Sequence, residues 1–152
     1  MAFQTPLFYK YYAQTYRIDS TPDGGLKGTI LNLQTGFFEQ DQDGRSHILE
    51  LVRSTTESNI DGPFKEEKFV QETEFERSHY LSGDGPIFAL YDTIKGIDAL
   101  VRREERRRTP QEVALIQALR KRTFKMWEDE AARIAAGEPP SFTVTSRFNA
   151  GQ

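Results

Sequence analysis

The sequence predicts an α+β fold, in which an antiparallel sheet of four to five strands is followed by an antiparallel helical hairpin packed on one face. Three observations support this prediction. Short segments rich in β-branched and aromatic residues occupy about residues 1–82 and are separated by Asp-Gly turns. Two stretches with apolar residues at three- and four-residue steps follow, over about residues 86–137. Aromatic residues make up 12% of the chain, so they supply much of the expected core.

The N-terminal half is predicted to form strands. Residues 3–18 repeat aromatic side chains at helical spacing, but their Tyr and Thr content favours a strand, which we prefer. Residues 26–38 and 46–56 are predicted to pair as a hairpin around Asp43-Gly44. In residues 69–76, Phe and Thr side chains alternate with charged ones, which predicts a strand with one core face and one acidic face.

The C-terminal half is predicted to form two helices. Gly85-Pro86 opens the first helix, and an apolar stripe follows. The second begins at Thr109-Pro110-Gln111-Glu112, where Thr caps, Pro takes the first helical position and Glu reaches back. Its apolar stripe runs from Val113 to Ile134, and Gly137 ends it. Because the junction is short, we prefer an antiparallel hairpin to a single kinked helix.

We expect a single α+β domain over residues 1–138, with a tail over residues 139–152. The chain has 152 residues, a common domain size that is sufficient to bury a core. The segment 141–148 has strand character after a proline break. The tail could therefore add an edge strand to its own sheet or to a neighbour's.

Composition predicts a cytoplasmic protein with no membrane association. The chain contains no cysteine, which excludes disulfides, thiol catalysis and zinc sites built on thiolates. No apolar run approaches the roughly 20 residues that a membrane helix needs. The N-terminus lacks the basic and then apolar segments of a secretory signal.

The charge is unevenly distributed on a chain whose net charge is −3. Residues 1–85 carry 8 basic and 14 acidic side chains, whereas residues 86–152 carry 12 basic and 9 acidic ones. Arginine presents a planar fork that suits phosphate, so this basic helical region makes single-stranded nucleic acid the alternative partner. Interleaved acidic residues favour instead a helix face that neutralises itself. The basic residues concerned are Arg102, Arg103, Arg106, Arg107, Arg108, Arg120, Lys121, Arg122 and Lys125.

Aromatic residues bear on the same alternative. Strands followed by a packing helix, with surface aromatics such as Tyr9, Tyr11 and Phe37, resemble the general plan of some single-strand-binding domains. A tyrosine stripe of this kind is more often part of a core. On the second helix, Phe124, Met126 and Trp127 span more of the circumference than one packed face needs. They are the candidate partner interface, and burial against the chain's own sheet is the competing interpretation.

One acidic pattern resembles a calcium-binding EF-hand loop. Its candidate ligands are Glu39, Asp41, Asp43 and Glu50, with the last at the twelfth place. Glu stands at the first place where Asp is usual, Ser46 takes the usual apolar place, and no helix precedes the pattern. These departures favour a polar hairpin turn over a metal site.

Enzyme chemistry has little support in the sequence. His47 and His79 are the only histidines, and no phosphate-binding glycine loop is present. No cofactor and no catalytic residue is predicted. The leading hypothesis is a non-enzymatic binding or adaptor protein that acts through protein–protein contacts as a homo-oligomer, such as a homodimer. Single-stranded nucleic-acid binding is the alternative, and a small pocket enzyme of unknown reaction is the second alternative.

Overall fold

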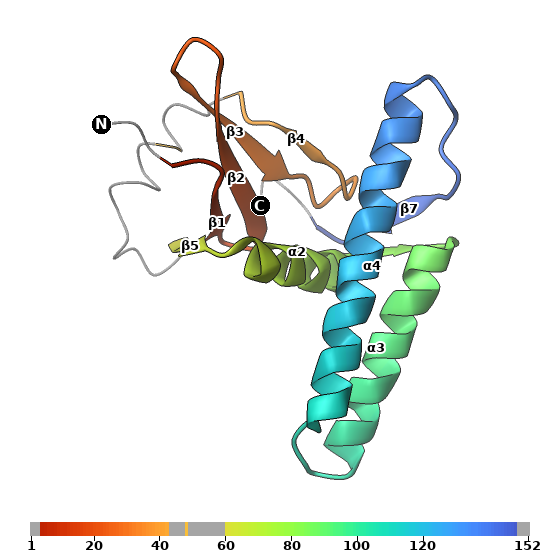
Figure 1. Cartoon of the computed structure of the whole chain (residues 1–152). Coiled ribbons are helices and arrows are strands. Elements are labelled where there is room, and N and C mark those ends of the chain that lie inside the picture. The colour runs from red at the N-terminus through yellow and green to blue at the C-terminus, as the bar shows by residue number, and fades with distance from the viewer. Residues whose placement is uncertain (1–3, 43–47, 49–59, 149–152) are drawn as a thin grey trace.

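The computed structural model describes residues 4–42, 48 and 60–148, and it has the predicted α+β fold (Figure 1). Five strands form one antiparallel sheet in the order β4-β3-β2-β1-β5. Helix α2 follows the last strand of this sheet, and α3 and α4 follow α2. In Figure 1, α3 and the first half of α4 run side by side as a hairpin that projects away from the sheet.

The first two strands, β1 (Leu7–Tyr11) and β2 (Gln14–Ser20), pair as an antiparallel hairpin. The strand predicted for the N-terminal segment is therefore correct, although the chain reverses once within it. Tyr12 lies in this reversal, with a φ of 57°. Strand β1 also pairs with β5 (Ile60–Phe64), and β2 pairs with β3 (Leu26–Leu31), which completes the centre of the sheet.

Strand β3 reverses into β4 (Phe38–Gln40) through a turn over residues 32–37. The side chain of Asn32 forms this turn. Its Oδ1 accepts hydrogen bonds from the backbone N–H groups of Gln34 at 2.8 Å and Thr35 at 3.3 Å. Asparagine favours turns because its side chain satisfies nearby backbone groups in this way.

The prediction of one strand over residues 26–38 is wrong, because the Asn32 turn divides that range into two strands. The turn predicted from the sequence, at Asp43-Gly44, lies outside the described residues. The second predicted strand, over residues 46–56, also lies outside them except for Ile48. Ile48 is helical and buried.

The strand predicted over residues 69–76 is wrong, because this range belongs to helix α2 (Glu66–Tyr80). The buried positions include Phe69, Thr73 and Arg77, which are spaced by four residues as one face of a helix requires. The sequence pattern was misread because charged side chains occupy buried positions of this helix. Those charges were expected to face solvent, but partners inside the fold hold them.

Helices α3 (Pro86–Arg103) and α4 (Pro110–Ala135) form the predicted antiparallel pair. Helix α2 covers one face of the sheet, where it contacts β1, β2 and β5, and α4 packs on α2. The Nε2 of Gln71 on α2 donates a hydrogen bond to the backbone oxygen of Gln117 on α4 at 2.9 Å. Much of the contact between the hairpin and the sheet therefore passes through α2.

The tail contributes a short strand to its own chain. Strand β7 (Val144–Ser146) pairs antiparallel with β6 (Leu81–Gly83), which directly follows α2. The two form a separate two-stranded sheet and do not extend the five-stranded one. The backbone N–H of Arg147 also donates to the backbone oxygen of Tyr80 at 3.0 Å, which holds the tail against the end of α2.

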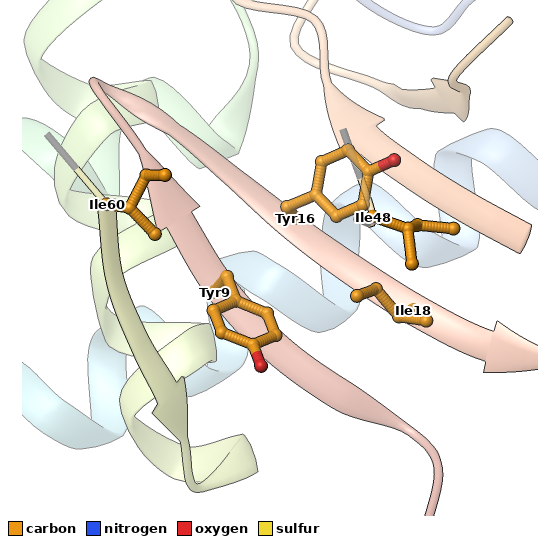
Figure 2. Packing of buried hydrophobic residues seen from close by; sticks show 5 residues of the cluster. All are labelled: Tyr9, Tyr16, Ile18, Ile48 and Ile60. Atoms are coloured by element: carbon orange, nitrogen blue, oxygen red, sulfur yellow. The ribbon is translucent and has the colours of Figure 1, made fainter. Parts of the chain in front are cut away.

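The face of the sheet that carries Tyr9 and Tyr16 holds a hydrophobic cluster (Figure 2). The Tyr16 hydroxyl donates to the Asp41 carboxylate at 2.7 Å, and its ring lies directly over Gly28. A Cβ at position 28 would lie 1.8 Å from the Tyr16 hydroxyl, so this close approach requires glycine. Burial, with the hydrogen bond to Asp41, raises the pKa of Tyr16. The buried members are Tyr9, Tyr16, Ile18, Ile48 and Ile60.

A buried polar network lies among α2, α3 and α4. The Glu74 carboxylate accepts hydrogen bonds from Arg77 Nη1 and from the Tyr91 hydroxyl, both at 2.7 Å. The same hydroxyl accepts a hydrogen bond from Trp127 Nε1 at 2.8 Å. Arg77 Nε donates to the backbone oxygen of Gly36 at 2.8 Å, in the β3–β4 turn. Burial, with the charge of Glu74, raises the pKa of Tyr91 well above its ordinary value.

Aromatic rings surround the guanidinium of Arg77. Its Cζ lies 4.7 Å from the ring centroid of Trp127, 5.2 Å from that of Phe38 and 5.6 Å from that of Phe124. Aromatic faces attract cations, and this attraction strengthens when water is excluded. The side chains of Glu74 and Arg77 are only 0% and 3% exposed, so this ion pair depends on protein partners alone.

The variant Arg77→Met should lower the free energy of unfolding by about 3–5 kcal/mol, because it leaves the buried Glu74 carboxylate without its cation. The double variant Glu74→Gln with Arg77→Met should lose less than the sum of the two single variants. Urea denaturation followed by circular dichroism measures both effects. Arg17→Met is the control, since it breaks a more exposed ion pair with Asp19 and should cost less than about 1 kcal/mol. A similar small loss for Arg77→Met would contradict this account.

Candidate functional site

The tip of the hairpin is closed by the helix cap that the sequence predicted. The Oγ1 of Thr109 accepts a hydrogen bond from the backbone N–H of Glu112 at 3.1 Å. In return, Oε1 of Glu112 accepts one from the backbone N–H of Thr109 at 2.8 Å. Pro110 stands in the first turn. This reciprocal cap fixes where α4 begins and how it leaves the loop.

Two arginines of the loop tie it to both helices. Arg106 donates from Nη1 and Nη2 to the two carboxylate oxygens of Glu112, at 2.7 and 3.1 Å. Arg108 donates from Nε and Nη2 to the two carboxylate oxygens of Asp98 on α3, both at 2.8 Å. Paired hydrogen bonds of this kind fix orientation as well as distance. The hydrogen bond from Arg106, with that from the Thr109 backbone, lowers the pKa of Glu112 to about 2.

The basic residues proposed for nucleic acid differ in their surroundings. Arg106 and Arg108 hold the loop, and Lys125 donates to the Asp129 carboxylate at 2.8 Å. Arg120 is partly buried, and burial, with the positive charge of Arg108, lowers its pKa. Arg108 and Arg120 therefore lie close enough for their charges to interact. The other proposed residues are exposed: Arg102, Arg103, Arg107, Lys121 and Arg122.

The candidate partner residues on α4 are largely used inside the chain. Trp127 is 1% exposed and belongs to the core of its own chain. Phe124 packs against Phe69 of α2 with ring centroids 6.1 Å apart, and Met126 packs against the cluster that contains Trp127. The sequence pattern did not indicate that α2 covers this side of α4, because residues 69–76 were predicted to form a strand.

Large apolar side chains remain exposed elsewhere, on the part of the hairpin that projects from the sheet (Figure 1). Leu100 of α3 is 40% exposed and Leu115 of α4 is 47% exposed. Ile97 and Leu119 are partly buried and lie beside them on the same helices. We call these four residues the apolar face. When the apolar stripe of a helix is wider than its contact with the partner helix, the remaining apolar residues stay exposed unless a third element covers them.

The four residues lie on one side of the hairpin. Residues of a helix are about 100° apart. Leu100 directly precedes the buried Val101, and Leu115 directly precedes the buried Ile116. Each leucine is therefore turned about its helix axis by the same angle, and in the same direction along the chain, from the buried side of its helix. In an antiparallel pair of helices, residues that are turned in this same way from the buried side lie on the same side of the plane that contains the two helix axes. Arg120 is rotated in the opposite sense and contacts α2, so the apolar face lies on the side away from α2.

The acidic pattern that resembles a calcium loop does not assemble in the described part of the chain. Asp43 and Glu50 lie outside the described residues. Glu39 is on β4 and accepts a hydrogen bond from the asparagine of the β3–β4 turn, and Asp41 accepts one from Tyr16. Among the described residues, no group of three or more His, Asp or Glu side chains could hold a metal ion.

An open groove of about 750 Å³ lies between α2 and α4. Charged and amide side chains line it, including Glu66, Gln71 and Lys121. Of the two histidines, His47 lies outside the described residues, and His79 is exposed on α2 and does not line the groove. Of the two histidines, the described one therefore lies outside this groove.

The sequence analysis misplaced two aromatic side chains. Tyr9 was expected at the surface, but it is 4% exposed because it points into the cluster of Figure 2. Phe75 was expected in the core, but it is 47% exposed on α2. A helical period over residues 66–80 would have placed Phe75 away from the face of Phe69 and Thr73, and it was the available signal.

Comparison of the chain with models of protein families, with curated proteins and with solved structures finds no match. Within residues 4–42 and 60–148, no helix is long and apolar enough to cross a membrane.

The cap of α4 should weaken in acid. The folded pKa of Glu112, about 2, lies below its ordinary value of 4.5, so its stabilisation is complete above about pH 4.5 and is lost as the pH falls toward 2. NMR titration should give this midpoint, with amide protection at the start of α4 declining over the same range. Arg106→Gln should raise the midpoint, whereas Lys125→Gln should not, because Lys125 pairs with Asp129. A midpoint at the ordinary pKa of glutamate in the unmodified protein would contradict the pairing of Arg106 with Glu112.

Proposed function

We propose that this chain is a non-enzymatic binding or adaptor protein that acts through protein–protein contacts and associates with a second copy through its apolar face. The observation that supports this most is the exposure of Leu100 and Leu115 on one side of a projecting, internally clamped hairpin. Burying such apolar surface drives association. The absence of cysteine fits a reducing compartment, so we propose a cytoplasmic location.

A second copy suits this face in geometry. Two hairpins that meet through their apolar sides form a four-helix bundle, in which each helix is covered by two neighbours. A two-fold axis between them makes the contact self-complementary, because each copy supplies the same residues. Helix α3 has 18 residues and is therefore about 27 Å long. Two such helices packed about 10 Å apart present a whole side of roughly 500 Å², and the apolar face is the part of that side near the tip.

The area buried between two copies sets the expected affinity of their association. Two copies that cover the whole side of each hairpin together bury at most about 1,000 Å², near the lower limit for a specific interface. We therefore expect association that depends on protein concentration. The exposed arginines at the tip, Arg102, Arg103 and Arg107, favour an arrangement in which the tips of the two hairpins point in opposite directions. That arrangement separates like charges, which otherwise repel.

Light scattering after size-exclusion chromatography tests the proposal. The unmodified protein should approach twice the 17.5 kDa mass of one chain as its concentration rises. The double variant Leu100→Glu with Leu115→Glu should stay at one chain mass, because it places charges in the centre of the buried face. Ile134→Glu is the matched control. Ile134 is likewise exposed on α4, at 38%, but it lies at the end of the helix that is far from the tip. It should associate as the unmodified protein does.

Two outcomes would reject the proposal: a mass of one chain at high concentration, or equal loss of association in the control variant. Circular dichroism must show unchanged helix content in each variant. Because the chain has no cysteine, Arg107→Cys then tests the orientation. Ready disulfide cross-linking through position 107 would mean that the tips meet, which contradicts the proposed arrangement.

A further inference from the structure

The outer side of α2 carries an exposed aromatic ring that the core does not use. Phe75 is 47% exposed, and the residues around it on α2 are polar or charged. Two cations from distant parts of the chain approach this ring. Lys10 Nζ on β1 lies 5.6 Å from its centroid, and Arg120 Cζ on α4 lies 5.7 Å from it.

Lys10 is held in place by two carboxylates of α2. Its Nζ donates to Glu76 at 2.8 Å and to Glu72 at 3.0 Å. Burial lowers the pKa of Lys10, but the hydrogen bonds with Glu76 and Glu72 outweigh this effect, so its pKa is raised overall. Lys10 therefore keeps its charge, but two anions already neutralise it. Lys10 therefore holds β1 against α2 beside the Phe75 ring, and it attracts a further anion only weakly.

Arg120 differs from the other cations near the loop. Arg106 and Arg108 use their guanidinium groups in paired hydrogen bonds with carboxylates. Among the residues that the structure describes, none accepts a hydrogen bond from the guanidinium of Arg120. The group is also partly buried, so it is less hydrated than a free arginine. A guanidinium has five N–H donors in a fixed fork, which an anion could occupy here.

A second ring and a second guanidinium continue the same surface. The ring of His79 is parallel to that of Phe75, with an interplanar angle of 1° and centroids 6.4 Å apart. Arg147 Nη2 lies 3.1 Å from His79 Nδ1. A guanidinium can only donate, so Nδ1 of His79 accepts this hydrogen bond. The backbone N–H of Arg147 donates to Tyr80, which keeps its side chain beside α2.

We propose that this surface, the α2 platform, binds a nucleobase on Phe75 with a neighbouring phosphate on Arg120, as part of a single-stranded nucleic acid. Aromatic rings stack on bases, and adjacent guanidinium groups bind the backbone. A base parallel to Phe75 is also parallel to His79, beside which Arg147 offers a second phosphate contact. The platform consists of Lys10, Phe75, His79, Arg120 and Arg147.

Charge favours a single strand over a duplex. The chain has a net charge of −3, and Glu72 and Glu76 lie next to the ring, which opposes binding of a dense polyanion. A single strand exposes the faces of its bases, whereas a duplex keeps them stacked inside. The platform is on the α2 side of the hairpin, opposite the apolar face. Its occupancy and the proposed self-association therefore do not compete.

Fluorescence anisotropy with a labelled uridine octanucleotide tests the platform in the full chain. The unmodified protein should bind this strand, and Phe75→Ala should weaken binding about tenfold at every salt concentration. Arg120→Gln should weaken binding and also reduce the slope of log affinity against log salt by about 0.7. If Arg120→Gln lowers the melting temperature, Arg147→Gln replaces it, with the same expected direction.

Two variants serve as matched controls. Tyr12→Ala removes an aromatic side chain that is 59% exposed in the β1–β2 reversal, away from α2. Arg122→Gln removes an exposed arginine two positions from Arg120. Both should bind as the unmodified protein does. Equal weakening by either control, or unchanged binding by Phe75→Ala, would overturn the proposal.

Competitors then identify the source of the base. If adenosine monophosphate binds as tightly as the strand, the platform is a mononucleotide site, and tighter binding of the strand identifies the strand. Equal binding of the mononucleotide would contradict the single-stranded partner, whereas tighter binding of the strand supports the proposal. Tighter binding of a duplex of equal length, or no binding of the strand at about 50 mM salt, would reject it.

Discussion

The arrangement of the three helices against the β3–β4 turn depends on the buried ion pair between Glu74 and Arg77. A charge removed from water must be paired and hydrogen-bonded, or it destabilises the fold. Glu74 therefore requires the hydroxyl of Tyr91 on α3, and Arg77 requires the carbonyl of Gly36 in the β3–β4 turn. Trp127 of α4 closes the group by donating to Tyr91 and by lying beside the guanidinium. Three helices and the β3–β4 turn therefore meet at this one buried ion pair.

The turn at Gly36 must come very close to Trp127 for this to occur. A Cβ at position 36 would lie 2.5 Å from the Trp127 ring, and the φ of 88° there is one that glycine adopts without strain. With α4 anchored at Trp127, its N-terminal half extends beyond the sheet beside α3 (Figure 1). The loop at the tip of the hairpin is held by paired hydrogen bonds from Arg106 to Glu112 and from Arg108 to Asp98.

The two functional proposals follow from what this arrangement leaves exposed. On the side of the hairpin away from α2, Leu100 and Leu115 lack a covering element. On the α2 side, Phe75 and Arg120 meet at a junction of three elements, β1, α2 and α4. The first surface is apolar and suits another protein surface, whereas the second combines aromatic rings with cations. Each therefore predicts a partner of different chemistry, and neither uses residues of the buried network.

The sequence by itself determined the features that depend on neighbours along the chain. These include the cap at Thr109, the apolar stripe of α4 and the strands near the N-terminus, because capping and periodicity are local properties. Only the tertiary structure decided that residues 66–80 are a helix with charges inside, because Glu74 and Arg77 find partners that are far away in the sequence. The same holds for which aromatic side chains stay exposed, since burial depends on the element that packs above them.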